Sequence, residues 1–118
     1  MKETNNSLVE SVGSGKIKYQ GKWYAKSLII GIDKIIYPWK HPDVSDLDMI
    51  DFEPFFDGNI EVILLGTGTK QVFPDSRLLT KILKRGFGIE VMDSKSACRT
   101  FNLLVSEYRR PLAMLILE

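Results

Sequence analysis

A chain of 118 residues with 44% hydrophobic and 26% charged residues predicts one globular domain rather than a disordered or fibrous chain. The net charge of +1 gives no electrostatic basis for binding nucleic acid or an acidic membrane surface. A lone cysteine cannot form an internal disulfide, and no apolar run approaches the ~20 residues of a membrane span. The N-terminal residues also lack the apolar core of a secretory signal. We therefore expect a cytoplasmic protein.

The first third of the chain alternates short apolar runs with turn residues. Residues 1–15 are polar and contain glycine, which predicts a loosely ordered N-terminal tail before a single globular α/β domain at residues 16–118. Apolar runs within residues 16–37 are separated by turn residues, which predicts a small antiparallel meander of three or four strands. Pro38 ends this meander, because proline has no N–H group for a strand ladder.

An acidic segment follows. Residues 41–57 contain six acidic residues and no Lys or Arg, whereas residues 1–40 contain seven basic and three acidic residues. Such a charge run usually forms a solvated surface. We expect a loop and a short helix at residues 46–51, with Ser45 as the cap and Asp48 at the capping-box position. The alternative is a cation site or a docking surface for a basic partner.

The second half predicts strands that alternate with helices. Residues 60–65 are β-branched and almost wholly apolar, as in a strand covered on both faces. Apolar residues at positions 78, 79, 82 and 83 share one helical face, and a strand at residues 88–92 precedes a second amphipathic helix. Residues 111–117 predict a final buried strand. This order predicts a right-handed crossover over residues 60–92 and three parallel strands.

Three motifs resemble those of a family of small α/β domains of unknown function. The family includes mitochondrial NADH dehydrogenase (complex I) assembly factor three and the adipogenesis-associated Mth-type domain protein. The motifs are Ile-Leu-Leu-Gly-Thr-Gly at 63–68, Gly-Ile-Glu-Val-Met-Asp at 88–93 and Ala-Cys-Arg-Thr-Phe-Asn at 97–102. The resemblance implies an α/β fold with three layers, a mixed central sheet of about five strands, two main helices and the N-terminal β-meander. Tyr108 departs from the Glu-Gly-Arg turn that is frequent in the family, which implies a longer second helix here.

Candidate site residues follow two neighbouring predicted strands, where open α/β sheets place their ligands. The first group is the loop Gly66, Thr67, Gly68 and Thr69. The second group begins the second helix and comprises Asp93, Ser94, Cys98, Arg99 and Asn102. Backbone N–H groups of the loop are able to bind an anion. A tight turn that needs glycine for its backbone angles is the favoured interpretation.

The helix residues carry two open questions. Cys98 lies one turn into the helix, where the helix N-terminus favours a thiolate. A nucleophile also needs a base, and free cysteines are often buried. A buried, inert thiol is therefore the favoured interpretation. Arg99 and Asn102 share a helical face near Asp93. Arg99 either holds a carboxylate or phosphate in the crevice or pairs with a neighbouring acid, while Asn102 satisfies loop carbonyls.

Two functions remain as hypotheses. The only histidine, His41, has no accompanying ligands, so we predict no metal centre, and we also expect no cofactor and no catalytic residues. The first hypothesis is a non-catalytic protein-binding or assembly-factor-like module, as the family resemblance implies. The alternative is a protein, with or without an activity, that binds a small molecule or anion between Gly66–Thr69 and Asp93–Arg99.

Overall fold

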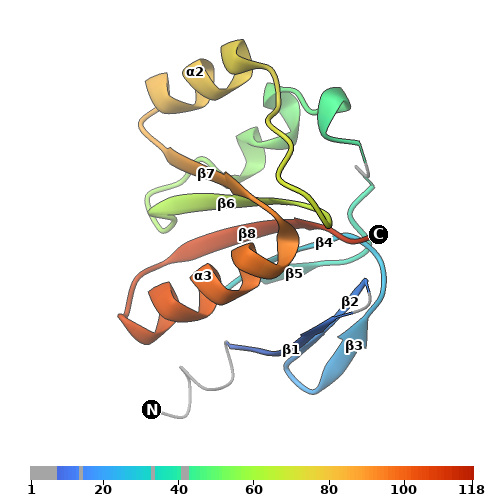
Figure 1. Ribbon diagram of the computed structural model, residues 1–118. Helices are drawn as coiled ribbons and strands as arrows, with labels where there is room; N and C mark the ends of the chain where they lie inside the picture. Colours follow the sequence, from blue (N-terminus) through green and yellow to red (C-terminus); the bar gives the residue numbers. More distant parts are fainter. Residues whose placement is uncertain (1–7, 14, 33, 41–42) are drawn as a thin grey trace.

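The computed structural model describes residues 8–13, 15–32, 34–40 and 43–118, and its centre is a five-stranded mixed sheet (Figure 1). In spatial order the strands are β5 (Lys34–Ile36), β4 (Leu28–Gly31), β8 (Pro111–Ile116), β6 (Val62–Thr67) and β7 (Gly88–Met92). Strand β6 is parallel to both β7 and β8, and β4 is antiparallel to β8 and to β5. The three predicted parallel strands and the mixed sheet implied by the family resemblance are confirmed.

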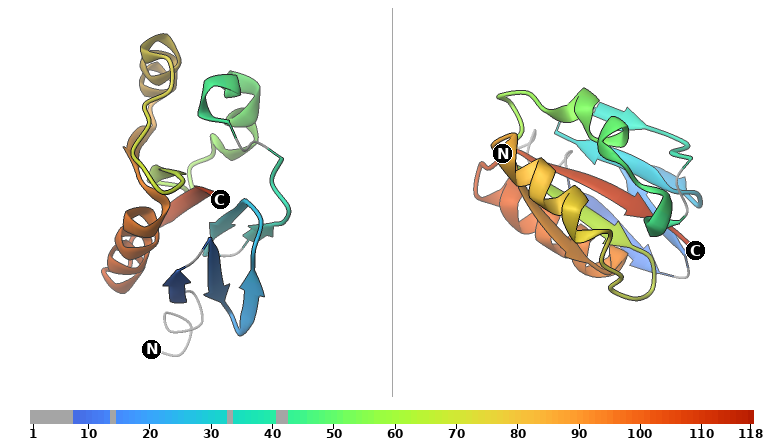
Figure 2. Two further views of the ribbon diagram at one scale, coloured as in Figure 1. Left: turned by 45° about the vertical axis from the view of Figure 1, so that its right-hand side comes forward. Right: turned by 90° about the horizontal axis from the view of Figure 1, so that it is seen from above.

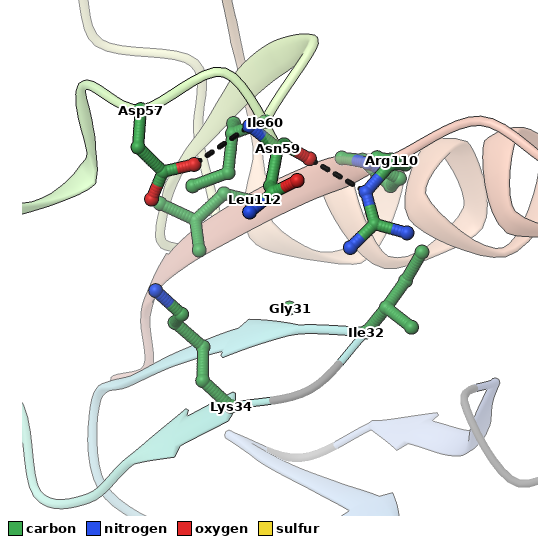
Figure 3. Close-up of a pocket in the computed structure, with 9 residues that line it drawn as sticks. Gly31, Ile32, Lys34, Asp57, Asn59, Ile60, Arg110 and Leu112 are labelled. Carbon is green, nitrogen blue, oxygen red and sulfur yellow. Dashed lines mark hydrogen bonds between the residues drawn. The ribbon is translucent and has the colours of Figure 1, made fainter.

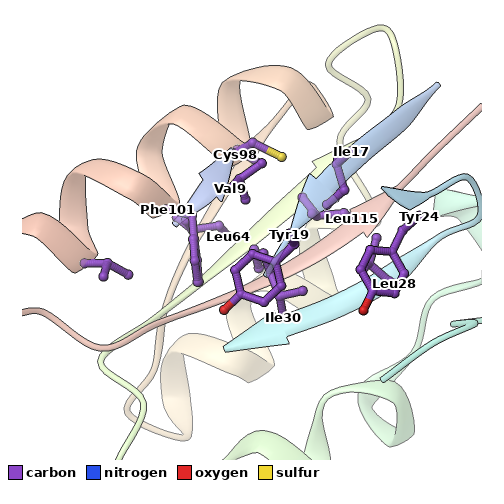
Figure 4. Close-up of a cluster of buried hydrophobic side chains, with 13 residues drawn as sticks. Val9, Ile17, Tyr19, Tyr24, Leu28, Ile30, Leu64, Cys98, Phe101 and Leu115 are labelled. Atoms are coloured by element: carbon purple, nitrogen blue, oxygen red, sulfur yellow. The ribbon is translucent and has the colours of Figure 1, made fainter. Parts of the chain in front are cut away.

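One face of the central sheet is covered by α3 (Ser94–Ser106) and by a separate three-stranded antiparallel sheet. The small sheet consists of β1 (Val9–Gly13), β2 (Lys16–Tyr19) and β3 (Lys22–Tyr24). Leu64 from β6 packs there with Tyr19 and Phe101, whose rings lie edge to face at 6.2 Å (Figure 4). Apolar side chains that alternate along β6 therefore divide between two cores, as expected for a strand covered on both sides.

The opposite face is covered by α2 (Ser76–Lys84) and by three short 3-10 helices (Figure 2). These are η1 (Val44–Asp46), η2 (Met49–Asp51) and η3 (Glu53–Phe55). Ile63 and Leu65, the neighbours of Leu64, face this second core and lie with Phe52 and Ile82. The molecule thus has the three expected layers. Among the described residues, no helix has both the length and the apolar character needed to cross a bilayer.

The expected N-terminal meander is divided between the two sheets. The β4–β5 hairpin joins the central sheet through the pairing of β4 with β8. By contrast, β2 pairs with both β1 and β3 in the small sheet. The expected tail also differs, because residues 9–13 form β1. Asn102 on α3 fixes this strand: its Oδ1 accepts from Val9 N at 2.7 Å and its Nδ2 donates to Val9 O at 2.9 Å. The β4–β8 pairing and the contact between Val9 and Asn102 join residues far apart in the sequence, which local patterns do not encode.

The acidic segment folds differently from its predicted short helix. The predicted helix over residues 46–51 is replaced by the end of η1 and by η2, which are separated by residues 47 and 48. Asp43 rather than Ser45 caps η1, accepting from Ser45 N at 3.0 Å. Asp48 does take part in a capping box, together with Asp51. These acidic side chains satisfy backbone N–H groups at successive turns. His41 lies outside the described residues.

Tyr108 ends α3 instead of extending it, so the longer helix implied by the family departure is wrong. Tyr108 has a φ of 62°, Tyr108 N donates to Val105 O at 2.9 Å, and Arg109 N donates to Leu104 O at 2.8 Å. This pair of hydrogen bonds is a Schellman C-cap, which needs a left-handed residue at this position. Glycine adopts that conformation without steric cost, whereas tyrosine is strained by roughly 1–2 kcal/mol.

We predict that Tyr108→Gly raises the free energy of unfolding by about 0.5–1 kcal/mol, because relief of the strain exceeds the added entropy of an unfolded glycine. Urea denaturation followed by circular dichroism measures the change. Tyr108→Ala is the control, since it removes the exposed ring but keeps a side chain in the left-handed conformation. Equal stability of the Gly and Ala variants would contradict this explanation of the helix end.

Candidate functional site

The parallel strands β6, β7 and β8 finish at one edge of the sheet, and α3 begins there. Gly66 is paired with Met92 on one side and with Leu115 on the other. A Cβ atom on Gly66 would lie 2.9 Å from both Cα and Oγ of Ser94. Glycine is therefore required at this position because the backbone of α3 comes so close to β6.

The buried Ser94 hydroxyl joins two of these segments. Its Oγ accepts from Gly68 N at 2.8 Å and donates to Ile116 O at 2.5 Å, while Ser94 N donates to Gly68 O at 2.8 Å. Gly68 has a φ of 95°, which a side chain would strain. The Gly68 N–H group is consequently used inside the protein and does not point toward a ligand.

Thr67 is also turned into the protein. It is 6% exposed, its Oγ1 donates to Lys70 O at 2.5 Å, and the same oxygen accepts from Val72 N at 3.0 Å. The hydroxyl thus holds the following loop in place. Gly66 and Thr67 lie beneath the surface rather than in an open crevice.

A pocket of about 470 Å³ opens beside this junction. Five of the predicted residues line it, namely Gly68, Thr69, Asp93, Ser94 and Arg99. Among its other lining residues, three are charged and were not singled out from the sequence, namely Lys16, Lys95 and Glu118. Lys95 lies on α3 beside the predicted residues. Lys16 belongs to the small sheet and Glu118 follows β8, so only the tertiary fold brings these two to the pocket.

The charged groups of this pocket are already partly engaged. Asp93 caps α3: its carboxylate accepts from Ser96 N at 2.8 Å and from Ser96 Oγ at 2.7 Å. The Ser96 N–H group, its hydroxyl and the nearby Arg99 charge hold the pKa of Asp93 below its usual value. Arg99 is exposed and donates from Nη2 to Ser96 Oγ at 3.3 Å. Lys16 lies over the ring of Trp23 at 5.1 Å.

Cys98 and Asn102 face away from the pocket. The Cys98 side chain is 1% exposed and lies beside Val9 and Phe101 in the core (Figure 4). Burial raises the pKa of its thiol to about 12, so the thiol is neutral near pH 7. Asn102 is occupied by both backbone groups of Val9. Within the described part of the chain, no group of three His, Cys, Asp or Glu side chains is placed to hold a metal ion.

A second, smaller pocket of about 170 Å³ lies at the opposite end of the parallel strands (Figure 3). Lys34 and Arg110 line it, together with Asp57 and Asn59. Arg110 Nε donates to Asn59 O at 2.7 Å, which fastens the segment before β6 to the start of β8. Sequence motifs gave no signal for this pocket, because its walls come from three distant segments.

Comparison with known proteins identifies related sequences. A family model described as "Protein of unknown function (DUF498/DUF598)" matches residues 9–116. The 13 kDa major membrane protein of Francisella tularensis subsp. holarctica is 33% identical over 94 residues, which cover 79% of this chain and 76% of the relative. NADH dehydrogenase (ubiquinone) 1 alpha subcomplex assembly factor 3 of Danio rerio is 37% identical over 83 residues, which cover 69% of this chain and 48% of the relative. This chain therefore spans about half the length of that assembly factor.

Solved structures share the fold. A solution structure from Xanthomonas campestris has 32% sequence identity and a TM-score of 0.81, with 92% of this chain and 83% of that chain covered. A solution structure from Bordetella pertussis, described as a Mth938-like domain, has 22% identity and a TM-score of 0.76, with 98% and 87% covered. The second likeness concerns the fold alone.

We predict that Ser94→Ala lowers the free energy of unfolding by about 1–3 kcal/mol, because it leaves a buried carbonyl and a buried N–H group without their partner. Thermal and urea denaturation measure the loss. Ser106→Ala is the matched control, since this exposed serine bonds only to Asn102 O of its own helix, and its change is expected within about 0.5 kcal/mol. Equal effects of the two substitutions would contradict the structural role of Ser94.

The Cys98 thiol is expected to resist Ellman's reagent in the folded protein at pH 8 and to react rapidly after unfolding in urea. Its folded-state pKa lies above the ordinary value of 9.0, so its contribution to stability is present below pH 9 and is lost as the pH rises toward 12. Wild-type protein should therefore lose stability more steeply over this range than Cys98→Ala. Rapid native-state labelling would show that the thiol is accessible.

Proposed function

The chain belongs to the DUF498/DUF598 family of proteins of unknown function, and on that premise we propose that it is a protein-binding module of the assembly-factor type, without a catalytic centre. The observation that carries this proposal is the match to assembly factor 3 across 69% of this chain. Because the chain spans about half of that relative, we transfer only the general role of binding another protein and not the identity of the partner.

The candidate nucleophiles of the site support a role without catalysis. The Ser94 hydroxyl bridges Gly68 and Ile116, the Thr67 hydroxyl bonds to its own loop, and the Cys98 thiol is buried with a raised pKa. A nucleophilic side chain needs access to a substrate and a base within hydrogen-bonding distance. Ser94 instead stabilises the junction between β6 and α3, Thr67 holds the loop after β6, and Cys98 lies in the core.

The segment between β6 and α2 is the surface that we assign to the partner. Val72 is 47% exposed and Phe73 is 63% exposed, so two consecutive apolar side chains face outward. The backbone beneath them is fixed, because Val72 N donates to Thr67 Oγ1 at 3.0 Å and Gln71 Nε2 donates to Val91 O at 3.0 Å. An apolar anchor on a pre-ordered loop loses little entropy on binding. The fitting partner is a protein with an apolar pocket for Phe73.

A second function, binding of a small anion, is favoured by the pocket at the start of α3. Lys16, Lys95 and Arg99 line it, against the two carboxylates Asp93 and Glu118. Asp93 is engaged as the cap of α3. The remaining excess of positive charge suits a carboxylate or a phosphate. Because the net charge is near neutral, we do not propose nucleic acid as a ligand. The cytoplasmic location stays a prediction.

We predict that the chain retains a stoichiometric partner when it is used as bait in a lysate of its native host. Phe73→Ser should reduce the amount of retained partner at least about tenfold, as expected for loss of a central aromatic anchor. Quantitative mass spectrometry of the bound fraction measures the effect. Leu103→Ser is the matched control, because Leu103 is a similarly exposed apolar residue on α3, at 58%. A partner retained equally by both variants would contradict the assigned surface, and no partner under gentle conditions would contradict the function.

A further inference from the structure

The carboxylate of Glu118 is bound by the loop that follows β6. Its Oε1 accepts from Thr69 N at 2.9 Å and from Thr69 Oγ1 at 3.1 Å. The N–H group and then the hydroxyl of Thr69 hold the pKa of Glu118 below its usual value, so this side chain is an anion near pH 7. Anion binding was the alternative interpretation of this loop from the sequence, and the loop contacts an anion of its own chain.

Two glycines make room for this contact. A Cβ atom on Gly68 would overlap the Glu118 carboxylate, and one on Gly15 would overlap the Glu118 main-chain carbonyl. Both glycines have a left-handed backbone, with φ of 95° and 73°. Gly68 therefore lets the carboxylate lie close to the backbone of the loop, and Gly15 lets the main chain of Glu118 lie close to the small sheet.

The pocket is larger than this one carboxylate needs. Its volume is about 470 Å³, and Lys16, Lys95 and Arg99 line it beside Glu118. In the first turn of α3 the Ser96 N–H group is already bonded to Asp93. The contacts on which the binding capacity rests are those of Thr69, the space left by Gly68 and the three cationic side chains.

We infer that Glu118 is an internal occupant of a carboxylate-binding pocket and competes there with the carboxylate of an external ligand. This inference rests on the second function proposed above and names its ligand class. Displacement of Glu118 exposes the N–H and hydroxyl donors of Thr69, while Arg99 and Lys95 supply charge for an incoming carboxylate. The ligand is a free dicarboxylate or an acidic side chain of a bound peptide, since both present the same group.

The test is a titration of the ¹⁵N-labelled full chain with glutarate and, in a second arm, with an acetylated tri-glutamate peptide. Glu118→Ala removes the competitor and is expected to tighten binding about fivefold, because the binding-competent fraction rises. The amide signals of Gly68, Thr69 and Lys95 should shift. Glu118→Gln, which keeps the side-chain volume and an oxygen acceptor, provides a second variant if the alanine variant loses its native spectrum.

Glu107→Ala is the matched control, because it removes the same charge at the opposite, exposed end of α3 and should leave the affinity unchanged. Adding Arg99→Ala to Glu118→Ala should weaken binding again. Equal affinities of wild type and both Glu118 variants would overturn the competition while leaving the anion-binding function in place. No shift at Gly68 or Thr69 in any variant, with either probe at tens of millimolar, would overturn both.

Discussion

The close contact between Ser94 and the end of β6 is the constraint on which the rest of the structure depends. Gly66 has no side chain, so the backbone of α3 lies directly against the sheet, and the Ser94 hydroxyl joins Gly68 to Ile116. Because α3 is fixed at its first residue, the next turns place Cys98 and Phe101 in the core. The same contact sets one wall of the larger pocket.

This constraint changes what the glycine-containing loop is able to do. A loop of this kind after a buried strand usually suggests backbone donors for a phosphate. Here Gly68 N is bonded to Ser94 and Thr69 N to Glu118, so both donors are engaged within the chain. The binding properties of this region therefore depend on the exposed charged side chains around it, namely Glu118 and the three cationic residues. A protein partner is assigned to a different surface.

The local patterns of the sequence predicted much of the second half of the fold. The apolar run of β6 and the helical periodicity of α2 and α3 both follow from short-range chemistry. The pairing of β4 with β8 and the docking of Val9 on Asn102 were not predictable in this way, since they join residues more than 80 positions apart. At the site, Asp93 and Arg99 were found from the motif, but Lys16 and Glu118 reach the pocket only through the folded sheet.

Amide hydrogen exchange at Gly68 tests the central claim most directly. The account predicts that the Gly68 N–H, bonded to the buried Ser94 hydroxyl, exchanges slowly, at a rate close to those of the β6 core. Thr69, which is exposed and bonded to Glu118, should exchange faster than Gly68. Exchange at Gly68 as fast as at Gly58, which lies in an exposed turn, would show that the loop donor is not engaged and would contradict the account.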